Sequence, residues 1–321
     1  MPHAIRIHAQ GGPEVLQWES VELAEPGPDE VRLRHTAIGL NFIDVYERSG
    51  LYALALPAIL GREAAGVVDA VGSRVRQLAV GNRIAYLANG TYTDYKVMPT
   101  QRLVRIPDAI ADNQAAAMML KGLTVQALLR QVHRVRRNEF VLIHAAAGGV
   151  GLIAVQWAKH LGAKVIAIVG SQAKADLVLA NRADHALLAQ DDWLAQVKAI
   201  TKGQGVHVVY DSVGKDTFMQ SLDSLRPRGL MVTFGNASGP VPPFAPLELS
   251  KRGSLFLTRP TLFDYIATPR ELQRAAAELF GLVAKGVIDI HVGQTYALKD
   301  AAQAHRALEA RQTTGSTVLV P

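Results

Sequence analysis

Residues 145–151, AAAGGVG, have a spacing that can bind a nucleotide phosphate. They follow the apolar, strand-like run FVLIH (140–144). In a G-x-G-x-x-G turn the second glycine lets the backbone approach a pyrophosphate, and the third lets the next helix pack closely on the strand. Gly148 and Gly151 hold these two places, and Ala146 stands where the first glycine usually is. A slightly wider turn accepts the extra methyl group, so the pattern still predicts phosphate binding.

A helix must follow this turn if a phosphate is to bind there. Residues 150–162, VGLIAVQWAKHLG, supply it, and the free N–H groups and positive dipole end of a helix N-terminus attract a phosphate. A strand–helix bend without a ligand is the alternative interpretation of a single turn of this kind. We expect the turn to contact a cofactor through Ala147, Gly148, Gly149 and Gly151.

The end of the next strand-like run distinguishes between two cofactors. In NAD sites an Asp or Glu about 20 residues beyond the turn binds the ribose hydroxyls. Here KVIAIV (164–169) leads instead to Ser171, with Lys174 three residues further on. A 2′-phosphate is repelled by an acid but is bound well by a hydroxyl and an ammonium group. The alternative for Lys174 is a solvated lysine at the start of a helix. The pair favours NADPH over NADH.

From about residue 122 strand-like and helix-like runs alternate, which indicates parallel βαβ units in a doubly wound sheet. The strand-like runs are almost wholly apolar, as in a sheet covered on both faces. The expected strands are 140–144, 164–169, 185–189, 206–211, 229–235 and 254–258, and the expected helices are 150–162, 173–182 and 192–200.

The first hundred residues have a different pattern, with short apolar stretches separated by Gly and Pro, which is typical of a β-rich barrel or sandwich. Strand-like runs resume at 290–298 and 317–321, after an amphipathic helix over 269–286. We therefore predict an α/β protein in which a doubly wound, Rossmann-type domain is inserted in a β-rich domain. The expected domains are 1–121, 122–260 and a C-terminal return to the first domain over 261–321.

Composition narrows the function further. The 321 residues include 34 Lys and Arg against 28 Asp and Glu, a net charge of +6, which favours anionic ligands. The basic residues are scattered, whereas a nucleic-acid footprint needs a clustered basic face. There is no cysteine, which rules out disulfides, thiolate zinc sites and cysteine nucleophiles. No apolar h-region follows the N-terminus, and Phe140–Ala158 is interrupted by glycines. We expect a cytoplasmic protein that binds neither nucleic acid nor membrane.

At Gly61-Arg62-Glu63 the chain resembles the medium-chain dehydrogenase/reductase superfamily, in which a Rossmann domain is inserted in a GroES-like β-domain. Its zinc-dependent members carry Gly-His-Glu at this place and use cysteines as further ligands. Arginine has no lone pair to offer zinc at neutral pH, and no HxH or HxxxH pair is present. We expect a metal-free protein.

The chain resembles one branch of the superfamily from end to end, the zinc-free, zeta-crystallin-like NADPH:quinone oxidoreductases. That branch has Ala-x-x-Gly-x-x-Gly as its turn, which Ala145, Gly148 and Gly151 match. The chain departs from some members at Ala189, where they place a tyrosine against the adenosine phosphate, and this bears on the strength of the preference for NADPH. The resemblance is carried by HAQGGPEVL (8–16), IGLNFIDVYERSGLY (38–52), KGLTVQALLR (121–130), HAAAGGVGLIAVQWAKHLGAKVI (144–166), VVYDSVGKDTF (208–218), GLMVTFGNASG (229–239), RPTL (259–262) and EARQTTGS (309–316).

The resemblance implies further cofactor contacts. Lys174 and Arg311 would contact the 2′-phosphate; the alternative for Arg311 is a cation that favours a helix C-terminus. Phe234 would reach the nicotinamide half; its alternative is a core strand residue. The remaining implied contacts are Thr124, Val150 and Ser171 along the pyrophosphate and ribose, and Gly235 and Asn236 beside the nicotinamide.

A quinone that accepts a hydride becomes an anion, which must be hydrogen-bonded and protonated. Asn41, Tyr46 and Tyr52 are the candidate donors within NFIDVYERSGLY (41–52), and a phenol, with a pKa of about 10, is a suitable proton donor. A helix cap for Asn41 and ordinary packing for the tyrosines are the alternatives, and the resemblance favours the catalytic roles.

The predicted function is therefore NADPH-dependent reduction of a small quinone by hydride transfer in an interdomain cleft, without metal. A zinc-free 2-alkenal or enoyl reductase and an NADPH-binding protein without turnover are the alternatives. An apolar strand over 254–258 at the edge of the sheet would invite pairing with a second copy, so we expect a homodimer.

Overall fold

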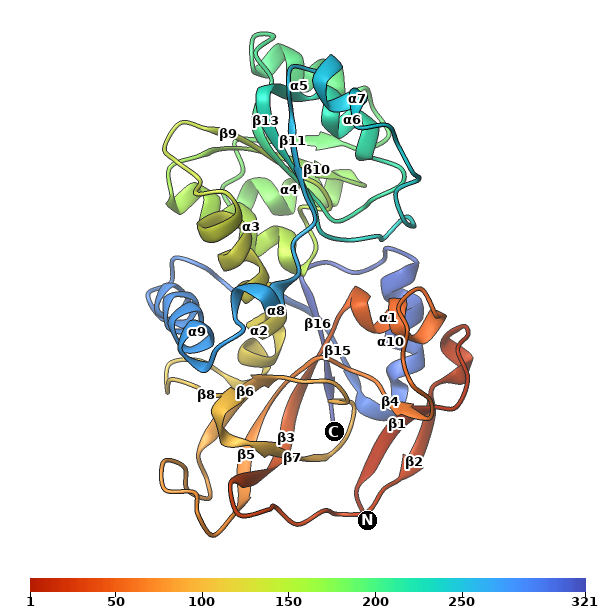
Figure 1. Ribbon diagram of the computed structural model, residues 1–321, viewed down its shortest axis with the longest axis vertical. Coiled ribbons are helices and arrows are strands. Elements are labelled where there is room, and N and C mark those ends of the chain that lie inside the picture. Colours follow the sequence, from red (N-terminus) through yellow and green to blue (C-terminus); the bar gives the residue numbers. More distant parts are fainter. The chain divides into compact units, whose positions relative to one another are not determined.

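The computed structural model describes all residues 1–321, which form two compact units (Figure 1). Unit 1 comprises Met1–Leu123, Thr268–Ala284 and Ile290–Pro321, and unit 2 comprises Thr124–Ala267 and Lys285–Asp289. A parallel α/β fold thus interrupts a β-rich fold, which confirms the predicted fold class.

Unit 1 contains a seven-stranded sheet in the order β15-β16-β3-β5-β6-β8, with β7 paired to β3, and a three-stranded sheet in the order β2-β1-β4. Buried apolar residues alternate along these strands, for example Val31 and Leu33 on β3, so one face of each strand enters the core. The strands are β1 (His3–Ile7), β2 (Gln17–Ser20), β3 (Glu30–Leu40), β4 (Ala58–Ile59), β5 (Glu63–Val71), β6 (Arg83–Leu87), β7 (Tyr95–Pro99), β8 (Leu103–Arg105), β15 (Val292–Ala297) and β16 (Ser316–Val320).

The helices of unit 1 begin and end at recognisable signals. Helix α1 (Phe42–Ser49) has Asn41 as its N-cap, and it ends at Gly50 in the left-handed conformation, φ 86°. Helix α2 (Asp112–Ala127) starts in unit 1, continues into unit 2 and ends in a π-helical turn, Leu128–Val132. The other helical segments of unit 1 are α9 (Pro269–Ala284), α10 (Ala301–Glu309) and short 3-10 turns at Pro13–Val15, Thr100–Arg102 and Leu298–Asp300.

Unit 2 is built on a six-stranded sheet in the order β11-β10-β9-β12-β13-β14, and all its strand pairs are parallel. The strand order reverses between β9 and β12, and a doubly wound sheet binds ligands at the carboxyl ends of its strands near such a reversal. The strands are β9 (Phe140–Ile143), β10 (Lys164–Val169), β11 (His185–Leu188), β12 (Val206–Asp211), β13 (Leu225–Thr233) and β14 (Phe256–Thr258).

Strand β14 lies at the edge of this sheet, which confirms the predicted edge position. Its Phe256 is 60% exposed, an unusual fraction for an aromatic side chain on a strand. No helix in the structure combines the length and apolar character needed to span a bilayer. The helices of unit 2 are α3 (Gly149–His160), α4 (Gln172–Ala180), α5 (Trp193–Ile200), α6 (Phe218–Asp223), α7 (Leu247–Lys251) and α8 (Leu262–Tyr265).

Candidate functional site

The predicted phosphate turn lies where β9 leads into α3, next to the point of strand reversal. Ala145 adopts the left-handed conformation, φ 49°, and Ala146 N donates to the Ile168 carbonyl at the end of β10, 3.1 Å away. Gly148 is the N-cap of α3 in extended conformation, and its N donates to the Ala145 carbonyl at 3.0 Å. The turn is therefore fixed to both strands, and the helix N-terminus starts directly after it.

The two glycines of the turn have different surroundings. A Cβ added at Gly148 would meet only the Ala145 carbonyl oxygen, at 3.3 Å, and its backbone angles suit any residue. A Cβ at Gly151 would lie 2.5 Å from both Cα and O of Ala146. Gly151 thus permits close packing of helix on strand, whereas the space at Gly148 is left open on the side where a phosphate would approach.

The end of β10 leads directly into the start of α4. Ser171 is the N-cap of α4, and its Oγ accepts from Lys174 N at 3.4 Å. Nothing lies within 4 Å of a Cβ added at Gly170, and no carboxylate takes the place of Ser171. A 12-residue helix with an open N-terminus beside a strand end without an acid fits a dinucleotide that carries a 2′-phosphate.

The loop after β13 carries three more predicted contacts, Phe234, Gly235 and Asn236. Phe234 N donates to the Asp211 carbonyl at 2.8 Å, and the Gly235 carbonyl accepts from Nη1 of Arg259 at 3.0 Å. The loop is therefore held at the carboxyl ends of β12 and β13. The contact of Arg259 with this loop could not be predicted from the sequence, because its partner is 24 residues away.

Asp211 is a buried carboxylate beside the candidate site that the sequence analysis did not single out. It is fully buried at the end of β12, where its Oδ1 accepts from the backbone N of Val213 (2.7 Å) and Gly214 (3.1 Å). Its Oδ2 accepts from the hydroxyls of Thr217 and Ser221. The carboxylate thereby shapes the loop beside the strand reversal. An acid at the end of the apolar run VHVVYD was the available signal.

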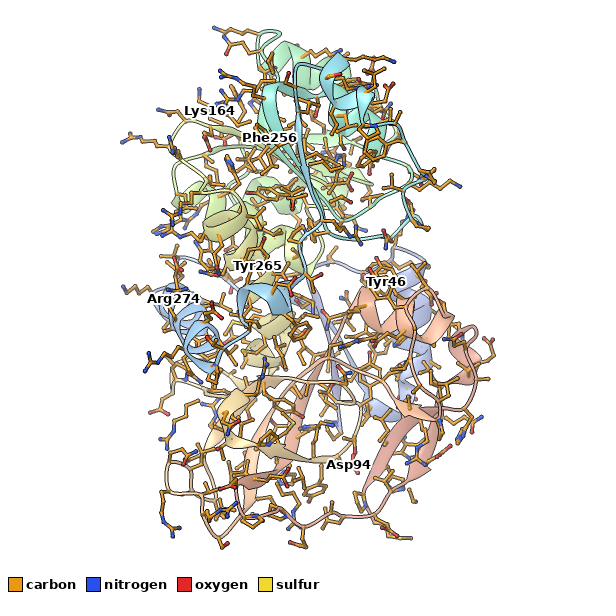
Figure 2. The ribbon with its side chains drawn as sticks, viewed as in Figure 1. Tyr46, Asp94, Lys164, Phe256, Tyr265 and Arg274 are labelled. Carbon is orange, nitrogen blue, oxygen red and sulfur yellow. The ribbon has the colours of Figure 1, made fainter.

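The three predicted donors belong to unit 1: Asn41 directly before α1, Tyr46 on it and Tyr52 just after it. Tyr46 and Tyr52 meet edge to face with ring centroids 5.2 Å apart, and Tyr52 N donates to the Tyr46 carbonyl at 3.0 Å. Figure 2 shows Tyr46 on α1. Asn41 caps the same helix, so one short helix positions all three residues.

Two buried carboxylates hold Asn41. Its backbone N donates to Oδ2 of Asp44 at 2.9 Å, and its side-chain Nδ2 donates to Oε1 of Glu63 at 2.9 Å. Glu63 is fully buried and also accepts from Lys121 Nζ at 2.6 Å and, through Oε2, from Leu120 N at 2.6 Å. Asn41 is therefore both the cap of α1 and part of a buried charged cluster.

The second carboxylate, Asp44, ends a chain of hydrogen bonds that starts at Glu309. Arg48 forms a bidentate pair with Glu309 (2.8 and 3.0 Å), and its Nη1 is 3.1 Å from Nδ1 of His305. Arginine only donates, so Nδ1 accepts and Nε2 carries the hydrogen. Nε2 then donates to Oη of Tyr92 (3.2 Å), and Tyr92 donates to Oδ2 of Asp44 (2.9 Å). The bonds from Arg48 through His305 and Tyr92 all point toward Asp44, whereas Arg48 donates to Glu309 in the opposite direction.

Burial is the main cause of the pKa shifts of Asp44, His305 and Tyr92. It raises the pKa of the Asp44 carboxyl to about 7, against an ordinary value of 3.8, although Asn41 and Tyr92 donate to it. Burial and the nearby Arg48 lower the pKa of His305 to about 3, so its imidazole is neutral, as the direction of the bonds requires. Burial also raises the pKa of the Tyr92 phenol well above its usual range.

Arg62, which stands where zinc-dependent members carry a histidine, forms an ion pair with Glu47 on α1 and donates to Asn89. Burial lowers the pKa of its guanidinium from the ordinary value, and Asp44 opposes that shift. No group of three or more His, Asp or Glu side chains gathers where it could hold a metal ion. Arg62 thus has an electrostatic function within unit 1.

The other predicted contacts are divided between the units. Thr124, half-buried on α2, belongs to unit 2 with the turn, Ser171 and Lys174. Arg311 belongs to unit 1, where it follows α10 in the left-handed conformation, φ 59°, with an exposed side chain.

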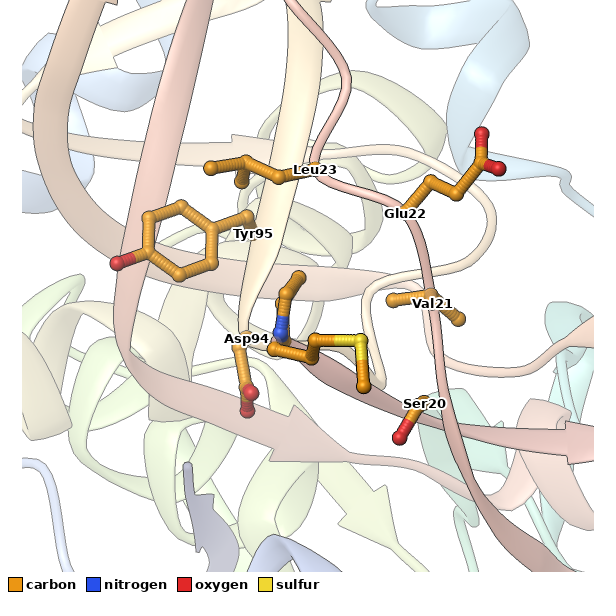
Figure 3. A pocket seen from close by; sticks show the side chains of 8 residues that line it. Ser20, Val21, Glu22, Leu23, Asp94 and Tyr95 are labelled. Carbon is orange, nitrogen blue, oxygen red and sulfur yellow. The ribbon is translucent and has the colours of Figure 1, made fainter.

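A surface hollow in unit 1 is lined by none of these residues (Figure 3). The end of β2 and the residues before β7 line it, together with Met1 and Pro2. Two carboxylates line it, Glu22 and Asp94, and Asp94 accepts from His3 N at 2.7 Å. The hollow brings no set of reactive groups together, so we assign it no chemistry.

Comparisons with known proteins agree with this geometry. The alcohol dehydrogenase GroES-like domain model matches residues 27–108, and the zinc-binding dehydrogenase model matches residues 149–280. A quinone oxidoreductase of Pseudomonas aeruginosa is 53% identical over the whole of both chains. The chain belongs to the quinone oxidoreductase family. The family assignment confirms the resemblance to the zeta-crystallin-like branch of the medium-chain dehydrogenases and reductases.

Two further relatives are similar to this chain over almost its whole length. The crystal structure of Escherichia coli quinone oxidoreductase complexed with NADPH matches with a TM-score of 0.97 and 48% identity, over 99% of this chain and 100% of that one. A 2-haloacrylate reductase of Burkholderia is 44% identical over 100% of this chain and 99% of its own.

Proposed function

We propose that this protein reduces quinones with NADPH as the hydride source. The open turn at Gly148, next to a strand end that carries Ser171 in place of an acid, is the observation that supports the cofactor. The quinone oxidoreductases that match the whole chain at 48–53% identity support the acceptor. The proposed cofactor contacts are Thr124, Ala147, Gly148, Gly149, Val150, Gly151, Ser171, Lys174, Phe234, Gly235, Asn236 and Arg311.

When bound, NADPH supplies a hydride, and the protein positions the acceptor and stabilises the charge that forms on it. Tyr46 and Tyr52 would donate hydrogen bonds to an oxygen of the reduced quinone, and a phenol can also give it a proton. Asn41 would hold the start of α1 in place, since its amide already donates to Glu63. In the second unit, Ser171 and Lys174 would bind the 2′-phosphate.

One experiment tests the function directly. Oxidation of NADPH and NADH is followed by absorbance with 1,4-benzoquinone, naphthoquinones and 2-alkenals as acceptors. We expect turnover with quinones and a clear preference for NADPH. Fast reduction of alkenals with no quinone turnover would instead support the second candidate, a conjugated-carbonyl reductase, which the 44% identical 2-haloacrylate reductase favours. Cofactor binding without any turnover would reject both activities.

We also propose that two copies pair along β14, as a homodimer. The strand lies at the edge of the sheet, and its Phe256 is 60% exposed. An open, apolar strand edge favours pairing with another chain. Light scattering tests the mass. The cytoplasm is the proposed compartment, and fractionation of cells that express the chain tests it.

A further inference from the structure

Lys121 is a buried cation that the proposed chemistry has not used. It lies on α2, is 6% exposed, and its Nζ donates to Oε1 of Glu63 at 2.6 Å. No other hydrogen bond or ion pair of this ammonium group exists in the structure. An ammonium carries three N–H donors, so two donors of a nearly buried group lack a protein partner. Unfilled donors in a buried site favour an incoming oxygen atom.

The surroundings fix this ammonium beside Asn41. Oε1 of Glu63 accepts both from Lys121 and from Nδ2 of Asn41, so one oxygen atom links the ammonium to the amide. Leu120 N holds the other oxygen of Glu63. A side chain at Gly39 would overlap this carboxylate and the Ala116 carbonyl, so glycine is what gives the carboxylate its room. Lys121 is thus held rigidly.

The charges around the ammonium are also unusual. Lys121 helps to lower the pKa of Asp44, against the larger effect of burial, so the two groups are close enough to interact. Oδ1 of Asp44 has no hydrogen-bond partner. Lys121, Asn41 and Tyr46 remain 6%, 7% and 8% exposed, so each keeps a small accessible surface. A fixed positive charge of this kind stabilises an anion most strongly where water is scarce.

We propose that Lys121 is a further catalytic residue, whose ammonium, oriented by Glu63 next to Asn41, donates a hydrogen bond to the quinone oxygen on which negative charge develops. This proposal rests on the proposed quinone reductase activity. Glu63 is then a positioning residue. The plain alternative is that Lys121 serves only as the counter-ion of a buried carboxylate.

Removal of the whole charge pair separates these two roles. Lys121→Met alone leaves Glu63 buried without its cation, which destabilises the fold whatever the catalytic role. The double variant Lys121→Met/Glu63→Gln removes both charges and keeps the volumes. The amide oxygen can still accept from Leu120 N, and the amide nitrogen can donate to Asn41 once the Asn41 amide turns over. The matched control is Lys159→Met/Asp184→Asn, which removes another lysine–carboxylate pair (2.7 Å). This pair belongs to unit 2, whereas the candidate donors belong to unit 1.

We expect the double variant at Lys121 and Glu63 to unfold near the wild-type temperature and to bind NADPH with unchanged Kd. Its kcat with 1,4-benzoquinone should fall about 100-fold, the usual loss for one oxyanion donor, with little change in KM. The control pair should keep its kcat. If the folded double variant at Lys121 and Glu63 keeps the wild-type kcat, the proposal is overturned and Lys121 is only a counter-ion.

A second measurement needs only the wild-type protein. 4-Nitrophenol, a chromophoric phenol, is titrated by absorbance in the presence of the protein and NADP⁺. We expect the bound phenol to ionise at a lower pH than the free one, because an ammonium stabilises the phenolate. An unchanged or raised ionisation pH would overturn the role of Lys121. Absence of quinone turnover by the wild type, with the phenol shift still present, would instead reject the proposed function.

Discussion

Replacement of Asp44 by asparagine tests the buried chain that ends at this carboxyl. Asp44 is fully buried, and burial raises its pKa to about 7 from an ordinary 3.8. Between these two pH values the folded protein keeps a proton that the unfolded chain has already released. The folded state is therefore favoured below about pH 4, and this contribution is lost as the pH rises to 7. A shift of this size corresponds to about 4 kcal/mol of unfolding free energy.

Asparagine has nearly the same volume as aspartate and keeps an oxygen that can accept from Asn41 N and from Tyr92, but it does not titrate. Urea unfolding of both proteins at several pH values from about 4 to 8 measures the effect. We expect the unfolding free energy of the wild type, minus that of Asp44→Asn, to fall by about 4 kcal/mol over this range. The same change at exposed Asp108 is the control and should give a flat difference.

A flat difference at Asp44 would refute the reasoning, because Asp44 would then titrate alike in the folded and unfolded states. A difference that rises with pH would refute it in the other direction. Tyr92, Asn41 and the nearby cations would then outweigh burial and keep the carboxylate charged.

Three further outcomes are expected. Gly148→Ala should raise the Kd for NADPH about tenfold, or about 1.4 kcal/mol, at an unchanged unfolding temperature, because the added Cβ meets no protein atom closer than 3.3 Å. Gly151→Ala should instead lower the unfolding free energy by about 1–3 kcal/mol through overpacking. Calorimetry together with NADPH titration separates the two effects. Lys174→Ala should raise the KM for NADPH about tenfold and leave the KM for NADH unchanged, as expected for a charge-assisted bond to a phosphate. The same change at exposed Lys198 on α5 should alter neither KM. Equal effects of Lys174→Ala on both cofactors would contradict the contact between Lys174 and the 2′-phosphate. Phe256→Lys should give a monomer by light scattering, and a retained dimer would place the interface elsewhere.

The sequence predicted those features that depend on local pattern. The apolar strands of unit 2 predicted a parallel sheet because both faces are covered, and the two glycines after the first strand located the turn. Asn41 was recognisable as a helix start because a short amide before an apolar, periodic run is a typical N-cap. Helix α2 was not anticipated as one element, because it continues through the position where a domain boundary was expected.

The buried charged cluster could not be predicted in the same way. Glu63 and Lys121 are 58 residues apart, and Arg48 and Glu309 are 261 apart, so no local spacing connects them. Charged residues are by default placed on the surface, and only the fold shows that these are covered. A signal existed at Lys121, a single cation within the apolar run AAAMMLKGLTV, but its carboxylate partner could not be named from sequence.

The Arg48–Glu309 pair also has a consequence for the order in which a newly synthesised chain can fold. The sheet of unit 2 is complete once residue 258 has been made, since its strands lie within 140–258. The sheet of unit 1 lacks β16 (Ser316–Val320), its link between β3 and β15, until these residues leave the ribosome. Arg48 is almost fully buried in the folded protein, and its carboxylate partner Glu309 is synthesised 261 residues after it. The cofactor-binding half is built first, and the half that carries the candidate donors is closed last.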